Sequence, residues 1–329
     1  MSVNWRRHFE LQLSASNGET ITLSDFKVTF EIDCPQAAGW RVATIRIFNL
    51  NRDTQNKIIN RQYNLVQVIA GYKGAQEAAT GENYGLIFAG ELRFTFAGRD
   101  KDNPTDTFTL IQARDGHQAV MNAVVHDTLG AGYAAEHTNT LMMRSFAAQG
   151  LTQGQRPALP ATTFPRGKVF YGMTHDYMND FAAQCRATWQ IVNGKVLLVP
   201  DENYIYDPVV LNSDTGLVGM PEQTMNNGVN VRCLINPRIQ PNGLIHLDQA
   251  LILHKEYASA DIANAKGYLT PTAGNNAPED KQGLATDGLY VVTSIKYTGD
   301  TRGTAWYMDM ICLTQAQKQK MQKSNPSGN

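Results

Sequence analysis

The first third of the chain alternates apolar and polar residues with a period of two. Phe9, Leu11 and Leu13 begin this pattern, and residues 26–34 repeat it over a longer stretch. Such alternation predicts antiparallel strands that bury one face. Further runs of the same kind lie at 41–48, 65–72, 86–98 and 106–113. We interpret residues 1–115 as a closed or nearly closed β-barrel.

Residues 41–60 combine a strand with a short helix. Ala43, Ile45 and Ile47 alternate with polar residues, and Asn51 then fits the N-cap of a helix over 52–60. The negative charge of Asp53 in the first turn suits the helix dipole. The stretch therefore predicts a strand, a capped turn and a helix in sequence.

The middle of the chain, 116–205, mixes helical and strand patterns and predicts an α+β lobe. One helix is expected over 134–149, and a second begins after Thr174 as N-cap. Asn193–Gly194 is the preferred pair of a type I′ hairpin. The apolar residues that share one face of the second helix are Tyr177, Met178, Phe181, Ala182 and Cys185.

The period of two returns in residues 206–315, which predict a second β domain; the resemblance described below implies that this domain is a β-barrel. Its apolar face includes Trp306, Met308, Met310 and Cys312. A polar insertion is expected near 254–286, and 316–329 is expected to form a flexible tail. The fold class is therefore mainly β with a central α+β lobe. In the stretch 289–297 the predicted buried face consists of Leu289, Val291, Thr293, Ile295 and Tyr297.

Composition excludes several classes of protein. The 329 residues include 29 Lys and Arg against 30 Asp and Glu, so the net charge of -1 argues against a dedicated nucleic-acid binder. The chain has no apolar run long enough to span a bilayer, and we expect no membrane insertion. The four cysteines lack C-x-x-C spacing, so free thiols are expected rather than disulfides or zinc ligands.

The search for reactive chemistry predicts no catalytic residue, no cofactor and no metal site. Residues 130–135, GAGYAA, match G-x-G-x-x-A before a helix, but no acidic residue lies between His137 and His175 to hold a ribose. We interpret these glycines as a turn. Arg144, Arg156, Arg166 and Lys168 give that acid-free run a local positive charge. It is either a contact for an acidic partner or DNA, or a solvated face, and we favour the solvated face.

The order of four short motifs resembles the baseplate hub proteins of contractile-tailed bacteriophages. That family is related to the hub half of type VI secretion spike proteins. The resemblance extends from about 8 to 314. The motifs are Asn-Leu at 49–50 between a strand and a short helix, AGY at 70–72, IF-x-G at 87–90 and GDTRGTAW at 299–306.

The resemblance implies a non-enzymatic structural protein of the virion, located in the tail baseplate and made in the bacterial host cytoplasm. Family hubs are homotrimers in which each subunit supplies two tube-type antiparallel β-barrels. The resulting pseudo-sixfold ring joins a threefold central spike to the sixfold tail tube. Its lumen lets the tape measure protein and the genome DNA pass without specific binding. Other implied partners are a tube-initiator protein and the baseplate wedge proteins.

Three other functions remain as alternatives. A hexameric tail-tube initiator or distal tail protein belongs to the same structural class, but two barrels in one chain favour the trimer. A tail-associated cell-wall hydrolase requires convergent carboxylates or a metal, of which the sequence shows no pattern. A carbohydrate-binding β module leaves the α+β lobe unexplained.

The resemblance also places the contacts between subunits. The helix at 52–60 is expected on the outer side of the first barrel, where subunits meet. The loop 73–85 is either a docking hairpin or an ordinary solvent loop, and Trp306 is expected in the barrel core rather than at an interface. The predicted interface residues are Arg52, Gln55, Asn56, Lys57, Lys73, Glu77, Glu82 and Arg302.

Overall fold

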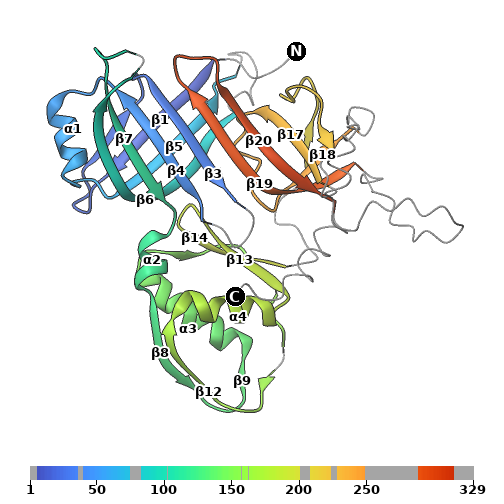
Figure 1. Ribbon diagram of the computed structural model, residues 1–329. Helices are drawn as coiled ribbons and strands as arrows, with labels where there is room; N and C mark the ends of the chain where they lie inside the picture. Colours follow the sequence, from blue (N-terminus) through green and yellow to red (C-terminus); the bar gives the residue numbers. More distant parts are fainter. Residues whose placement is uncertain are drawn as a thin grey trace, which may run out of the picture.

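The computed structural model describes most of the chain as a β-rich body above a smaller lobe (Figure 1). Within the described residues the protein is mainly β and contains four helices. The predicted insertion at 254–286, the predicted tail at 316–329 and most of the loop 73–85 lie outside them. The described residues are 6–35, 40–74, 83–101, 103–156, 158–161, 163–200, 208–223, 228–248 and 288–314.

One continuous 13-stranded sheet forms the body, in the order β16-β17-β20-β19-β3-β4-β7-β6-β5-β1-β2, with β18 and β15 branching from β19. The first and last thirds of the chain meet where β3 pairs antiparallel with β19, with Ile32 opposite Tyr297. The strands are β1 (Arg7–Ser14), β2 (Thr20–Leu23), β3 (Val28–Cys34), β4 (Val42–Phe48), β5 (Leu65–Tyr72), β6 (Asn83–Arg99), β7 (Thr107–Arg114), β15 (Val209–Leu211), β16 (Glu222–Gln223), β17 (Gly228–Leu234), β18 (Leu244–Leu247), β19 (Leu289–Asp300) and β20 (Trp306–Leu313).

The two β-rich parts share one hydrophobic core. Phe9 and Phe30 stack at 5.5 Å between ring centroids, and Trp306 meets Phe30 edge-on at 5.5 Å. A Cβ atom on Gly299 would overlap the Phe30 ring, so this position requires glycine. Trp306 is buried, which confirms its predicted place in the core. Side chains that are far apart in the sequence therefore close the same core.

The strands of 1–115 and 206–315, which the sequence analysis assigns to two domains, belong to one sheet. The pairings among the described strands leave the sheet open, with β16 and β2 at its ends, and close no barrel. The mainly β class is confirmed, whereas the two separate barrels and the boundaries near 115 and 205 stay predictions. The physical reason for the difference is the β3–β19 ladder, a long-range pairing that has no local signature in the sequence.

The predicted face of β19 is buried at Val291, Thr293, Ile295 and Tyr297 and half-buried at Leu289, but Tyr290 and Val292 on the other face are buried too. A β-bulge interrupts the β19–β20 register between Val292 and Ser294. Tyr290 and Val292 therefore contribute to the shared core before the bulge, and Ile295 and Tyr297 after it. A bulge inserts one residue and reverses which face the alternate side chains occupy. Val291 is buried as predicted but lies outside the shared core, and Leu289 is only half-buried.

The lobe has a hydrophobic core of its own, built around α3 and α4. Both predicted helices are confirmed, although Thr174 is the first residue of α4 rather than its cap, and its hydroxyl lies 2.7 Å from the Ser145 hydroxyl. Its elements are α2 (His117–Asn122), β8 (Val124–Leu129), β9 (Tyr133–Ala134), α3 (Ala135–Ala147), β10 (Thr152–Gln153), β11 (Thr163–Phe164), β12 (Lys168–Met173), α4 (Thr174–Gln184), β13 (Ala187–Val192) and β14 (Lys195–Pro200).

Two smaller expectations are also confirmed by the structure. Asn193 and Gly194 have φ of 52° and 75°, which confirms the type I′ hairpin. The four cysteines are free, as predicted. No helix in the described ranges is long and apolar enough to cross a membrane.

Candidate functional site

The corner at 41–60 forms as predicted from the sequence. The side chain of Asn49 bonds to Asp106 and Thr107, and Asn49 takes a positive φ of 55° that turns the chain away from β4. Asn51 caps α1 (Arg52–Ile59), because its Oδ1 accepts the Thr54 N–H at 2.7 Å. Ile58 is the buried residue of the helix. The other face of α1 is therefore left for solvent or a partner.

The predicted interface residues of α1 differ in how they are held. Arg52, Asn56 and Lys57 are exposed, and Lys57 Nζ lies 3.3 Å from Glu19 Oε1. Gln55 is half-buried and donates from Nε2 to the Thr109 hydroxyl at 3.1 Å, so its amide faces β7. Three of the four side chains thus lie on the open side of the helix.

The other predicted residues lie away from α1. Lys73 is exposed just after β5, and Glu77 and Glu82 fall outside the described residues. Arg302 lies in the β19–β20 turn, where its guanidinium donates to the Asp25 carbonyl at 2.7 Å. Among the predicted interface residues that the structure describes, only the four on α1 lie on one element (Figure 1).

A buried polar junction connects the body to the lobe. Arg41 donates to Asp115 Oδ2 at 3.2 Å, to Asn193 Oδ1 at 2.8 Å and to the Ile87 carbonyl at 2.6 Å. Asp115 in turn accepts the N–H groups of Asn193 at 2.6 Å and Gly194 at 3.0 Å. The tip of the β13–β14 hairpin is thus held at the end of the sheet.

Burial sets the electrostatics of this junction. Only 6% of Arg41 and 2% of Asp115 are exposed. Burial raises the pKa of the Asp115 carboxyl, against the opposing effects of Arg41 and the two N–H groups. Burial also acts to lower the pKa of Arg41, but Cys34 and Asp115 offset that effect and the pKa lies above its ordinary value. Arg41 therefore remains charged, and the junction fixes orientation rather than performing chemistry.

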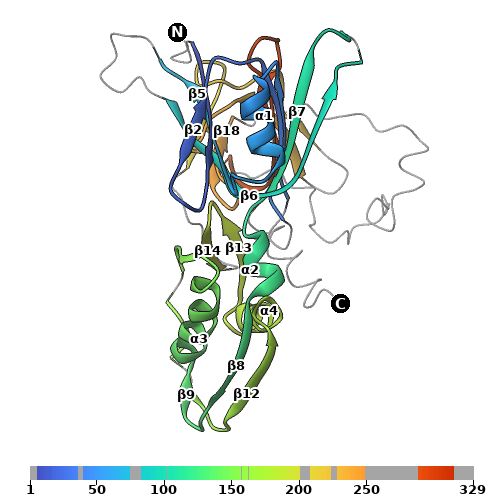
Figure 2. The same cartoon turned by 90° about the vertical axis from the view of Figure 1, so that its left-hand side faces the viewer.

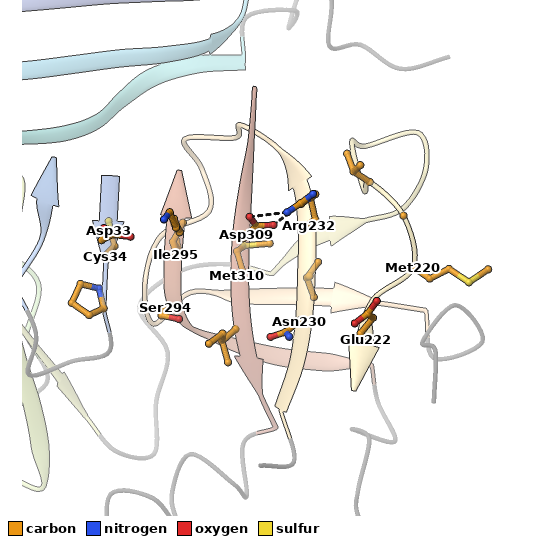
Figure 3. Close-up of a pocket in the computed structure, with 16 residues that line it drawn as sticks. Asp33, Cys34, Met220, Glu222, Asn230, Arg232, Ser294, Ile295, Asp309 and Met310 are labelled. Atoms are coloured by element: carbon orange, nitrogen blue, oxygen red, sulfur yellow. Dashed lines mark hydrogen bonds and ion pairs between the residues drawn. The ribbon is translucent and has the colours of Figure 1, made fainter. Parts of the chain in front are cut away.

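A shallow groove of about 700 Å³ crosses the outer face of β3, β19, β20 and β17 (Figure 3). Charged residues from neighbouring strands line its floor. Arg232 donates two hydrogen bonds to Asp309, at 2.6 and 3.1 Å. Lys296 lies opposite Asp309 on β20 and opposite Asp33 on β3. The hydrogen bond and charge of Glu31 raise the pKa of Lys296. These charges are largely matched with one another.

The outer wall of the groove is apolar and acidic. Val218 and Met220 are exposed, Glu222 follows them, and Figure 3 shows Met220 extending away from the strands. Within the described ranges no group of three or more His, Cys, Asp or Glu is placed to hold a metal ion.

The basic run in the lobe is mostly engaged inside the lobe. Arg144 lies 2.6 Å from Asp127, and Arg156 forms two bonds of 2.8 Å with Glu136. Lys168 lies over the ring of Phe170 at 5.2 Å. These contacts support the solvated-face interpretation, and Gly132, with φ of 85°, turns the chain as predicted.

Sequence reasoning missed one surface, on β6. Phe94 and Phe96 fit the alternating pattern of a half-buried strand, yet each is 51% exposed. A register shift between Leu92 and Phe94 on the β6–β7 ladder accompanies the change. The only signal in the sequence is the length of the apolar run, which exceeds that of its neighbours.

Comparison with known proteins identifies the fold. The 43 kDa tail protein of prophage MuSo2 from Shewanella oneidensis matches 95% of this chain and 99% of its own, with a TM-score of 0.56 at 8% identity. A tail protein from Neisseria meningitidis matches 96% of this chain and 98% of its own, with a TM-score of 0.55 at 7% identity. The fold of this chain is thus shared with these two tail proteins over nearly its whole length.

A more distant match is a component of the type VI secretion system of Escherichia coli, which covers 88% of this chain and 73% of its own with a TM-score of 0.47 at 7% identity. No protein-family model and no curated protein sequence matches the chain.

Proposed function

We propose that this protein is a structural subunit of a phage tail and acts as a trimeric baseplate hub. The fold that it shares with a prophage tail protein and a second tail protein supports the location in a virion tail. In the trimer, the subunits surround a lumen and adapt a threefold central spike to the sixfold tail tube. The protein has no enzymatic role in this proposal.

The observation that carries the proposal is the continuity of the sheet through the β3–β19 ladder. A ring that encloses a channel needs a wide wall whose backbone hydrogen bonds are satisfied within the wall itself. Here one chain supplies such a wall from both its first and last thirds. A symmetric ring of copies then hides the remaining edges and cannot grow without limit.

The proposed partners follow from this position in the tail. The tail tube or a tube-initiator protein binds on one side of the ring and the spike on the other, with wedge proteins around it. The tape measure protein and the genome DNA pass through the lumen, and the near-zero net charge suits passage without specific binding. The exposed residues of α1, with Lys73, Glu77, Glu82 and Arg302, are proposed contacts with these partners or with neighbouring copies.

Native mass spectrometry combined with electron cryomicroscopy tests the proposal. The expected particle contains three copies of the 36.4-kDa chain in a ring with threefold detail and a sixfold outline. Antibodies against the chain should label the baseplate end of purified tails. A six-copy ring would support the tube-initiator alternative instead, and peptidoglycan hydrolysis by the purified chain would overturn the non-enzymatic role.

A further inference from the structure

Within the described residues, the second half of β6 pairs with another strand on one side only, while α1 contacts β6 and the Arg61 guanidinium donates to the Arg93 carbonyl at 3.4 Å. Pairing with β5 ends at the Leu65–Glu91 position, whereas pairing with β7 continues to Arg99. From Phe94 to Arg99, the described part of the chain therefore supplies a partner strand on one side only. Figure 2 shows the β6–β7 hairpin rising from the body. An unpaired edge of this kind is a template for another chain.

The side chains at this edge make it apolar and basic. Phe94 and Phe96 are both half-exposed, and Phe96 contacts Phe108 with 6.2 Å between ring centroids. Arg93 and Arg99 are exposed on either side of them. We call residues 93–99 the β6 edge.

The β16 end of the sheet carries a second surface that is also apolar but has an acidic residue. The segment 218–222, which we call the groove wall, continues the sheet beyond β17, since the Val218 N–H bonds to the Arg232 carbonyl at 2.8 Å and Glu222 pairs with Asn230. Met220 is 64% and Val218 40% exposed, and Glu222 adds an exposed negative charge.

Both surfaces belong to the same face of the sheet. Phe94 lies opposite Gln112, Gln112 opposite Thr44, and Thr44 opposite Glu31. Glu31 and Asp33 share a face of β3, and Asp33 lines the groove. The β6 edge and the groove wall therefore lie at the two ends of one curved surface (Figure 1).

We propose that the β6 edge of one copy docks against the groove wall of a second copy. The occupant is a second copy because Phe94 and Phe96 with flanking arginines complement Met220 and Val218 with Glu222. The two surfaces are different, so the contact is heterologous and repeats from copy to copy until a ring closes. This inference rests on the proposed function and names the contact that builds the proposed ring.

Mixed single-cysteine variants test this contact. Phe96→Cys and Met220→Cys are each made in a Cys185→Ser background, because Cys185 is the only one of the four cysteines that is not buried. The full-length proteins are mixed and treated with a short bismaleimide. The mixture should give cross-linked dimers, whereas each variant alone should not, because in a heterologous contact position 96 never meets position 96. The variant that carries both cysteines should give a ring in which every copy is covalently linked to its neighbours.

A matched control places the cysteine at an exposed position of the lobe instead of at the β6 edge. Tyr171→Cys lies at an 81% exposed position, and mixed with Met220→Cys it should give no cross-link. Cross-linking of Phe96→Cys with itself would show a symmetric contact and overturn the proposal, as would the absence of cross-links in the 96–220 mixture. Trimers without this cross-link would refute the contact alone, whereas cross-linked copies that are absent from purified tails would refute the proposed function alone.

Discussion

At the scale of single residues, the buried Arg41–Asp115 pair links the sheet of the body to the hairpin of the lobe. It joins the start of β4, the end of β7 and the turn of the β13–β14 hairpin, which are far apart along the chain. A buried ion pair contributes little net stability over an apolar equivalent, but removing one partner leaves an uncompensated charge. The pair therefore specifies how the lobe is attached.

Replacing Asp115 by alanine should lower the free energy of unfolding by about 3–5 kcal/mol. The substitution leaves the Arg41 guanidinium buried without its carboxylate, and it leaves the Asn193 and Gly194 N–H groups without their acceptor. Urea unfolding measures the loss. The control is Asp127→Ala, which breaks the solvent-exposed pair with Arg144 and should lower the free energy of unfolding far less. Equal losses in the two variants would contradict the role of the junction.

At the scale of elements, turns and caps are where the sequence was most informative. The Asn193–Gly194 turn was predicted because a type I′ turn needs two residues that tolerate positive φ. The Asn51 cap was predicted because a short polar side chain at that point satisfies a free N–H of the helix. Both signals are local. The docking of the same hairpin on Asp115 has no such signal, because the partners are 78 residues apart.

Gly194→Ala tests the hairpin. Gly194 has φ of 75°, and nothing lies within 4 Å of an added Cβ, so the cost comes from the left-handed backbone alone. We expect a loss of about 1–2 kcal/mol in unfolding free energy, measured by thermal or urea unfolding. Gly130→Ala, where the space is equally open and φ is not in the left-handed region, should be close to neutral. A neutral Gly194→Ala would contradict the assigned turn.

Asn51→Ala tests the corner that opens the resemblance to hub proteins. Loss of the bond from Thr54 N–H to Asn51 Oδ1 should cost about 1 kcal/mol. Asn56→Ala, at an exposed position inside the same helix, serves as the control and should be neutral or slightly stabilising. Circular dichroism and urea unfolding report both effects. A larger loss for Asn56→Ala than for Asn51→Ala would show that the helix is not capped in this way.

The elements also show where sequence patterns fail. In β19 and β6 the alternation of apolar residues continues through a register shift. Around the shift in β19 both Val291 and Val292 are buried, and after the shift in β6 Phe94 and Phe96 are half-exposed. The order of apolar and polar residues alone does not reveal where a strand contains the additional residue of a β-bulge. Consequently Phe94 and Phe96, which carry the proposed contact between copies, were assigned to an ordinary half-buried strand.

At the scale of the whole molecule, the sequence predicted the mainly β class and the position of the lobe, but not the union of the two β parts. The lobe is visible because its helical period interrupts the strand pattern. The β3–β19 ladder is invisible because it joins residues such as Ile32 and Tyr297, whose partners only the folded chain defines. The candidate interface residues of α1 come from the resemblance and from the polar side of the predicted helix and stay predictions, whereas the relation between the β6 edge and the groove wall requires the strand order of the sheet.

Hydrogen exchange of the intact chain distinguishes one shared body from two independent barrels. Ile32→Ala removes a fully buried side chain from β3 and should cost about 2–5 kcal/mol. Because β3 pairs with both β4 and β19, amide protection should fall in β19 and β20 as well as in β4. Met142→Ala, in the core of the lobe, should lower protection in α3 and α4 while the sheet keeps its own. If amide protection fell in β4 but not in β19 and β20, the two β parts would unfold separately, as the boundaries drawn from the sequence imply.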